Sequence, residues 1–138
     1  MRTFLIALML LFSGLAQANP FAQSDFLPVN KAFVFSSERL DSGQMRLHWK
    51  ITDGYYLYQK RLKFDGLPVE QQPALPPALP HQDEYFGSTQ VYRGELELIV
   101  PADAGGQLRM GWQGCADAGL CYPPQTSLVN LGNTTVAE

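Results

Sequence analysis

Apolar and polar residues alternate with a period of two in several short segments of this chain. Residues 45–51, 95–100 and 108–112 carry an apolar side chain at every second position. Such alternation gives a β-strand one buried face and one solvent-facing face. No segment shows a sustained helical repeat, and Asp53-Gly54 marks a turn after the first of these runs. The sequence therefore predicts an all-β fold, an immunoglobulin-like antiparallel β-sandwich.

Shorter segments extend the expected sheets. Residues 55–58 are tyrosines and a leucine, which favour strands. Further strands are predicted near residues 32–35, 61–64 and 128–131.

A proline-rich stretch interrupts the strand pattern at residues 67–80. Proline has no amide donor and is excluded from a central strand, so this stretch is predicted to be an extended surface connection. It leads into residues 81–87, where two acids and two aromatic residues end at Gly87. The composition leaves two readings open: a polar turn whose rings pack on the sandwich edge, or a loop that covers something.

The first residues have the layout of a secretory signal peptide. A basic start at Arg2 precedes an apolar run at residues 4–15, and Ala16-Gln17-Ala18 forms a small-residue cleavage site. The run is shorter than the roughly 20 residues that a membrane-spanning helix needs. We therefore expect residues 1–18 to be removed on export, and residues 19–138 to form one domain.

Charge gives no reason to expect a nucleic-acid partner. The net charge is −3, and the sequence shows no lysine and arginine cluster of the kind that binds nucleic acid or anionic lipid.

Two cysteines, Cys115 and Cys121, lie in a glycine-flanked segment that offers the main candidate for chemistry. Export takes them to an oxidising compartment, where disulfides persist. A strand that ends near residue 113 and one that resumes near Cys121 would place the two cysteines opposite each other. Opposed residues of antiparallel strands are close enough for a disulfide.

The role of such a bond is open from spacing alone. A structural staple is its commonest role in secreted domains, and the corresponding hypothesis is an immunoglobulin-like binding module. A closed loop of about seven residues, however, gains only roughly 2.4 kcal/mol by loop closure, against about 4.7 for roughly 100 residues. A short exposed disulfide is also one that a thiolate can reach. Asp117, between the cysteines, is expected to raise the pKa of a thiol there.

A metal site built from both cysteines with His48 and His81 is disfavoured. Metal motifs usually show closer ligand spacing than these four residues have. No metal is predicted.

Four stretches together resemble the N-terminal periplasmic domain of the thiol:disulfide interchange protein DsbD, a protein-disulfide reductase. They are residues 53–58 (DGYYLY), 83–87 (DEYFG), 91–93 (VYR) and 113–124 (QGCADAGLCYPP). They occur in the family's order and at similar separations, and the similarity covers nearly the whole of residues 19–138.

This resemblance implies a redox role for the cysteines. Cys121 would attack the partner and Cys115 would resolve the mixed disulfide. Residues 83–87 would form a cap loop over the sulfurs. The order of the cap rings, Tyr85 then Phe86, differs from the family member used for comparison, so either ring is a candidate cover. The residues expected to line the site are Tyr56, Tyr58, Asp83, Glu84 and Asp117.

The resemblance also implies partners and a location. A thioredoxin-like domain would supply electrons in the periplasm. Disulfide isomerases and a thioredoxin-like protein of cytochrome c maturation would accept them. No cofactor beyond the Cys115–Cys121 disulfide is expected. Full-length members continue into a membrane-embedded electron-transfer domain and a thioredoxin-like domain, to which this chain would be attached if it is part of a longer protein.

Overall fold

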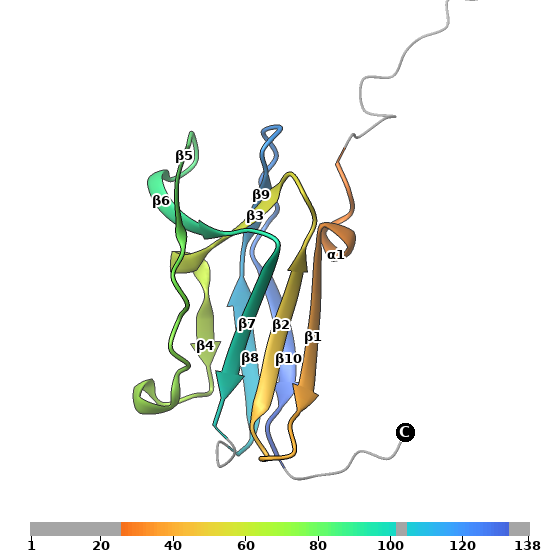
Figure 1. Ribbon diagram of the computed structural model, residues 1–138, viewed down its shortest axis with the longest axis vertical. Coiled ribbons are helices and arrows are strands. Elements are labelled where there is room, and N and C mark those ends of the chain that lie inside the picture. Colours follow the sequence, from red (N-terminus) through yellow and green to blue (C-terminus); the bar gives the residue numbers. More distant parts are fainter. Residues whose placement is uncertain (1–25, 102–104, 133–138) are drawn as a thin grey trace, which may run out of the picture.

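The computed structural model describes residues 26–101 and 105–132. They form short strands and three single-turn helices (Figure 1). The elements are α1 (Val29–Ala32), β1 (Phe33–Arg39), β2 (Met45–Ile51), β3 (Tyr55–Tyr58), η1 (Gln59–Arg61), β4 (Lys63–Asp65), η2 (Val69–Gln71), β5 (Leu79–Asp83), β6 (Gly87–Tyr92), β7 (Glu95–Val100), β8 (Gln107–Trp112), β9 (Gly114–Ala116) and β10 (Gln125–Asn130).

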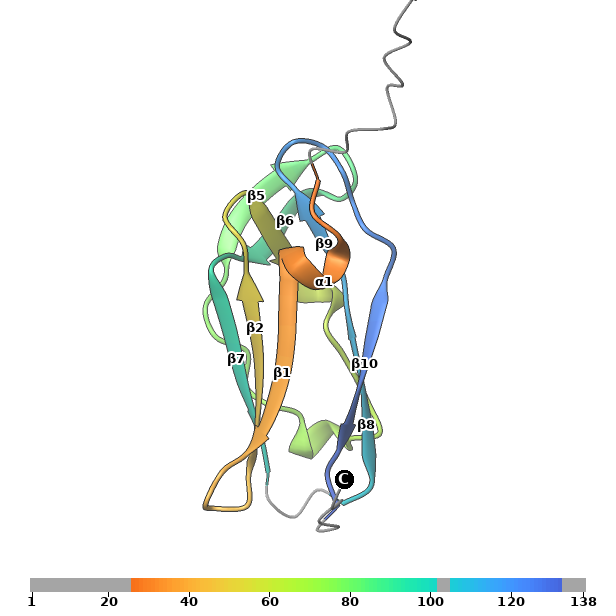
Figure 2. The ribbon, with the colours of Figure 1, turned by 90° about the vertical axis from the view of Figure 1, so that its right-hand side faces the viewer.

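Two three-stranded sheets form the body of a sandwich. One has the order β1-β2-β7 and the other the order β10-β8-β4, with every pairing antiparallel. Figure 2 shows β1, β2 and β7 in one layer and β8 and β10 in the facing layer. A third sheet, β5-β6-β3-β9, lies at one end, with the β9 hairpin at the top in Figure 1. The prediction of an immunoglobulin-like antiparallel sandwich is confirmed.

The core follows the alternation seen in the sequence. Along β2, Met45, Leu47, Trp49 and Ile51 are buried, while the residues between them face outward. Trp112 on β8 is buried in the same cluster. Period-two patterning therefore places both tryptophans inside the sandwich.

The predicted strands are found, with shifted bounds. The first begins at Phe33, after the single helical turn of α1, and runs on to Arg39. Residues 59–61 turn as a 3-10 helix, so β4 occupies only Lys63–Asp65. The last strand begins at Gln125.

One hairpin differs from the prediction. Residues 79–87, expected to be connection and loop, contain β5 and the start of β6, and these strands pair from Leu79 opposite Val91 to Asp83 opposite Gly87. β5 is the outer strand of its sheet, where the missing amide of Pro80 is tolerated. Its residues are at most half-buried, so no apolar alternation marked it.

The predicted signal peptide lies outside the described residues. Within the described part of the chain, no helix has the length and apolar character needed to cross a membrane.

Candidate functional site

The two cysteines form a disulfide at the end of the sandwich that carries the third sheet. Cys115 on β9 lies opposite Cys121 in an antiparallel bridge, with 4.0 Å between the Cα atoms. The Ala116 amide donates to the Leu120 carbonyl at 2.6 Å, and Gly119 turns the chain with a φ of +112°. The sequence prediction that the cysteines face each other across a short hairpin is confirmed.

A close approach to β3 fixes the base of this hairpin. Cys115 is paired with Tyr56 across the β3–β9 ladder. A Cβ on the preceding Gly114 would lie 2.8 Å from the Tyr56 carbonyl oxygen and would overlap the Phe33 ring. Glycine is therefore required at position 114, because any side chain would push β9 away from β3.

The two cysteines differ in accessibility. Cys115 is fully buried, with 0% of its surface exposed, whereas Cys121 is only partly buried. Cys121 is therefore the more accessible of the two cysteines.

Strand β3 separates the site from the main core. Tyr55 and Leu57 point into the sandwich core, while Tyr56 and Tyr58 belong to a second cluster with Cys115 and Val91. Both faces of β3 are buried, and the alternation of side chains assigns one face to folding and the other to the disulfide.

The Tyr58 hydroxyl is the polar group closest to the disulfide among the contacts of the described residues. Its oxygen lies 3.1 Å from Cys115 Sγ and 3.6 Å from Cys121 Sγ. The hydroxyl donates a short hydrogen bond to Asp83 Oδ2, which also accepts one from Tyr56 at 2.7 Å. Asp83 is thus connected to the sulfurs through Tyr58.

Ionisation in this network favours a charged carboxylate and neutral phenols. Burial raises the pKa of Tyr58, and its hydrogen bond to Asp83 raises the pKa further. Burial and the same carboxylate raise the pKa of Tyr56 to about 12. For Asp83, burial opposes the charge, but hydrogen bonds from Tyr58, Tyr56 and the backbone outweigh it and lower the pKa.

Asp83 also shapes the cap loop. Its Oδ1 accepts hydrogen bonds from the amides of Tyr85 at 3.0 Å and Phe86 at 2.8 Å. Gly87 then takes a φ of +62° and begins β6. An aspartate that accepts bonds from the following amides is a typical turn former, so one carboxylate holds both the loop and the tyrosines.

The structure distinguishes the two cap rings. Phe86 is half-buried and packs on the cluster that contains Cys115, with its ring 4.5 Å from that of Tyr58. Tyr85 is 50% exposed, and its hydroxyl donates to the Gly119 carbonyl at 2.8 Å. Phe86 therefore packs towards the cysteine cluster, while Tyr85 connects the cap loop to the cysteine hairpin.

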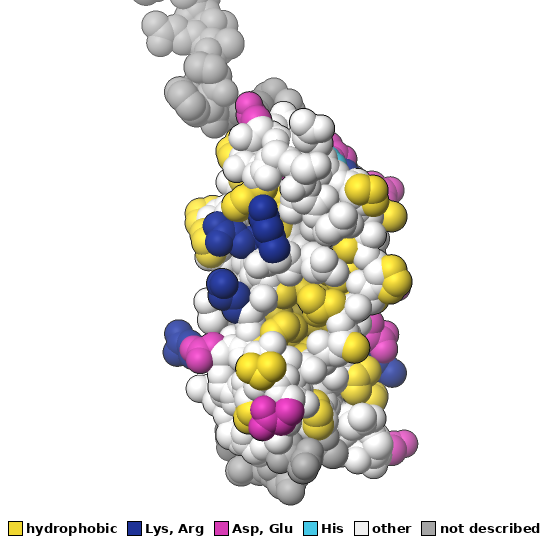
Figure 3. All heavy atoms as spheres, turned by 90° about the vertical axis from the view of Figure 1, so that its left-hand side faces the viewer, with side chains coloured by type: hydrophobic (Ala, Val, Ile, Leu, Met, Phe, Trp, Pro, Cys, Tyr) yellow, Lys and Arg dark blue, Asp and Glu magenta, His cyan; other side chains and the backbone are white. Residues whose placement is uncertain are grey.

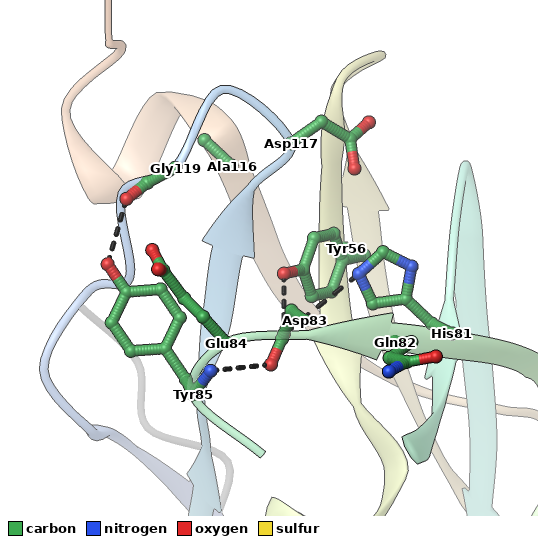
Figure 4. A pocket seen from close by; sticks show the side chains of 9 residues that line it. All are labelled: Tyr56, His81, Gln82, Asp83, Glu84, Tyr85, Ala116, Asp117 and Gly119. Atoms are coloured by element: carbon green, nitrogen blue, oxygen red, sulfur yellow. Dashed lines mark hydrogen bonds and ion pairs between the residues drawn. The ribbon is translucent and has the colours of Figure 1, made fainter. Parts of the chain in front are cut away.

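Asp117 and Glu84 lie beside the cap around a hollow of about 270 Å³ (Figure 4). Tyr56, His81, Asp83 and Tyr85 also line this hollow, and neither cysteine does. The three carboxylates therefore lie together between the cap loop and the cysteine hairpin.

Asp117 has a partner that sequence reasoning missed. Arg93, from the turn between β6 and β7, donates to both of its carboxylate oxygens at 2.9 and 2.8 Å and lies over the Tyr56 ring at 5.1 Å. The Arg93 hydrogen bonds lower the pKa of Asp117. Arg93 thus compensates the charge of Asp117. The carboxylate that is connected to the sulfurs, through Tyr58, is that of Asp83.

The residues of the disfavoured metal site are held in other contacts. His48 faces solvent on β2 beside Glu95, and His81 packs on Tyr56 at 4.3 Å. The two cysteines are bonded to each other.

Fold and site together define a class of protein: an immunoglobulin-like sandwich that holds a short-loop disulfide at one end under an aromatic cap. The family described as thiol:disulfide interchange protein DsbD, N-terminal, matches residues 23–133. The chain belongs to this family, as its motifs had indicated.

Relatives agree with this assignment. The chain is 61% identical to thiol:disulfide interchange protein DsbD 2 of Pseudomonas aeruginosa, over 97% of this chain and 24% of the relative. It is 39% identical to DsbD of Escherichia coli K12, over 94% of this chain and 24% of the relative. The chain thus spans about a quarter of the length of these curated relatives.

Solved structures give the same result. The reduced DsbD N-terminal domain of Neisseria meningitidis has a TM-score of 0.66 and 35% identity, over 79% of this chain and 91% of that one. A complex between the DsbD and PilB N-terminal domains of the same organism contains a chain with a TM-score of 0.64 and 33% identity, over 80% of this chain and 91% of that one.

Proposed function

We propose that this chain is a periplasmic thiol–disulfide exchange domain that takes electrons from a thioredoxin-like domain and reduces partner proteins through Cys121 and Cys115. One observation carries the proposal: the disulfide closes a short hairpin at one end of the sandwich, and one of its cysteines is buried while the other is only partly buried. A staple for the sandwich would join its two sheets, whereas this bond closes one small loop.

The exchange is a pair of displacements. A partner thiolate attacks Cys121 Sγ, the Cys115–Cys121 bond breaks, and Cys115 leaves as a thiolate that takes up a proton. The second thiol of the partner then attacks the mixed disulfide and releases Cys121. The partner dithiol is oxidised to a disulfide, and this disulfide is reduced to two thiols. Reduction of a downstream protein is the reverse sequence, which Cys121 begins and Cys115 resolves. Neither direction needs a cofactor.

The proposed partners are of the kind that members of this family bind. The DsbD N-terminal domain of Neisseria meningitidis forms a complex with the PilB N-terminal domain. Periplasmic disulfide isomerases and a thioredoxin-like protein of cytochrome c maturation are the proposed acceptors here. Export by a signal peptide at residues 1–18, and attachment to a membrane-embedded electron-transfer domain in a longer protein, belong to the same proposal.

Exchange is tested directly with purified proteins. The oxidised chain is mixed with the reduced PilB N-terminal domain of Neisseria meningitidis and with a reduced thioredoxin, and thiols are blocked at set times and counted by mass. Transfer of two electrons supports the proposal, and Cys115→Ala should accumulate a mixed disulfide through Cys121. If neither domain reduces the disulfide in the folded protein, the chain is no electron carrier. That result would favour the alternative hypothesis, an immunoglobulin-like binding module with a structural disulfide.

A further inference from the structure

Three basic residues lie in η1 and at the start of β4, and two of them contact the cap residue Phe86. Lys60 Nζ is 4.3 Å and Arg61 Cζ is 4.8 Å from the centre of the Phe86 ring. Arg61 and Lys63 line one hollow of about 220 Å³ together with Pro124, which follows Cys121 by three positions. Figure 3 shows basic side chains gathered beside apolar surface on this face. We call Lys60, Arg61 and Lys63 the basic rim.

The basic rim has no acidic partner of its own. Arg46 and Arg93 form ion pairs with nearby carboxylates, but within residues 26–101 and 105–132 no rim residue does. Arg61 Nε is moreover buried without a hydrogen-bond acceptor in this part of the chain. A buried donor without an acceptor is unfavourable, so an acceptor that reaches Arg61 when the cap moves would satisfy it.

The charges around the cap are therefore divided. Asp83, Glu84 and Asp117 line the hollow beside Tyr85 of the cap loop, whereas Lys60 and Arg61 contact the ring of the next residue, Phe86. A division of this kind at a binding surface steers a partner into one orientation.

Access to the disulfide leads past the basic rim. Phe86 and Cys121 are both partly buried and pack against the cluster that holds Cys115, so a partner that docks at Cys121 meets the Phe86 ring, and we expect the ring to move when it docks. Movement of the ring takes Lys60 and Arg61 away from their aromatic contact. A carboxylate at the edge of the partner would then replace the ring as their neighbour, with a stronger attraction than the ring provides.

We propose that Lys60, Arg61 and Lys63 form the docking surface for carboxylates that flank the reactive cysteine of a thioredoxin-like partner. This inference rests on the proposed exchange function and adds the chemistry that selects the partner. The three residues are close together in the sequence, at positions 60–63, but only the fold shows that Lys60 and Arg61 lie against Phe86.

The test is a charge reversal at the rim. In Lys60→Glu/Lys63→Glu, the second-order rate constant for reduction by the reduced PilB N-terminal domain should fall by about tenfold at low ionic strength. The deficit should shrink as salt is added, because screening removes long-range attraction. Stopped-flow tryptophan fluorescence follows the reaction, and circular dichroism checks the fold of each variant.

A matched control is Lys31→Glu/Lys50→Glu, which changes the net charge equally at exposed lysines away from the cap. This control should retain at least half of the unaltered rate. Dithiothreitol, which is uncharged, should reduce the rim variant no more slowly than the unaltered protein. Equal losses in the rim and control variants, or a parallel loss with dithiothreitol, would overturn the docking surface. Failure of the unaltered protein to exchange at all would instead overturn the proposed function.

Discussion

Asp83 is the residue on which most of the site depends. One of its oxygens holds Tyr56 and Tyr58, and the other holds the amides of Tyr85 and Phe86. Because Tyr58 donates its proton to Asp83, its hydroxyl faces the sulfurs with its oxygen. A thiolate formed there gains no hydrogen bond from Tyr58 and lies near a carboxylate, and both effects disfavour the thiolate.

Replacement of this carboxylate by an amide should make the reduced protein more reactive. In Asp83→Asn, the charge is removed and the Tyr58 proton becomes available to a sulfur. We expect the pKa of the attacking thiol to fall, because loss of the negative charge and a hydrogen bond from Tyr58 both favour the thiolate. Alkylation with iodoacetamide as a function of pH measures this pKa. The control is Glu84→Gln, one position away, because Glu84 does not make the hydrogen bonds of Asp83. If the thiol of Asp83→Asn titrates like that of the unaltered protein, Asp83 does not control the thiol.

Acid should weaken the fold through the same residue. The folded-state pKa of Asp83 is lowered below its usual value of 3.8, so its ionised form stabilises the fold at neutral pH. That stabilisation is complete above the unfolded pKa and is lost as the pH falls through the folded pKa. Urea unfolding between pH 6 and about 2 should therefore show a steeper loss of stability below about pH 4 for the unaltered protein than for Asp83→Asn. Parallel curves for the two proteins would count against this account.

Arg93 shows what sequence reasoning could not reach at the residue scale. Asp117 was expected to oppose a thiolate because it lies between the cysteines. Its partner is 24 positions away, and only the fold brings the two together. Sequence spacing identifies neighbours along the chain but not which charges are paired in space.

The Arg93–Asp117 pair should stabilise the cysteine hairpin modestly. The two side chains are 34% and 46% exposed, so water screens the ion pair. Its contribution to the free energy of unfolding is therefore about 0.2–1 kcal/mol. A double-mutant cycle with Arg93→Gln and Asp117→Asn measures the coupling by urea unfolding. Arg93→Lys should recover only part of it, because an ammonium does not reproduce the two-pronged contact. Strictly additive single variants would mean that the pair contributes nothing.

At the scale of elements, the cap is a β-hairpin rather than a free loop. β5 and β6 pair on both sides of the turn, and β6 pairs in turn with β3 beneath the tyrosines. The sequence marked the cap motif by its acids and rings but not the strands that carry it. β5 is a polar edge strand with a proline, and periodicity detects strands only when one face is buried. The cap is therefore attached to the strand that bears Tyr56 and Tyr58.

Removal of the inner ring should expose the disulfide. In Phe86→Ala, the packing on Tyr58 is lost, and an aromatic pair of this kind contributes about 0.5–1.5 kcal/mol. The rate of reduction by dithiothreitol should therefore rise by up to about tenfold. Tyr85→Phe, which loses only the hydrogen bond to Gly119, should give a smaller increase. The assignment of Phe86 as the cover fails if the two variants react equally fast.

At the scale of the whole molecule, folding and chemistry use different clusters. The sandwich core is formed by strands whose alternation of apolar and polar residues can be recognised in the sequence. This core contains neither cysteine. Cys115 belongs to the small cluster on the other face of β3. The fold was predictable because burial of one strand face requires a periodic pattern. The contacts of the site could not be predicted in this way. They join single residues from β3, the cap and the cysteine hairpin, and these residues share no periodic pattern in the sequence.

This separation predicts that the protein folds without its disulfide. In Cys115→Ala/Cys121→Ala, the main core is unchanged and only a short loop is freed. Closure of a loop of about seven residues contributes roughly 2.4 kcal/mol, which for a domain of this size lowers the Tm by roughly 10 °C. Urea unfolding followed by far-ultraviolet circular dichroism should remain cooperative, with an unchanged m-value. A non-cooperative transition, or a loss well beyond this amount, would mean that the disulfide holds the sandwich together and is not simply carried at its end.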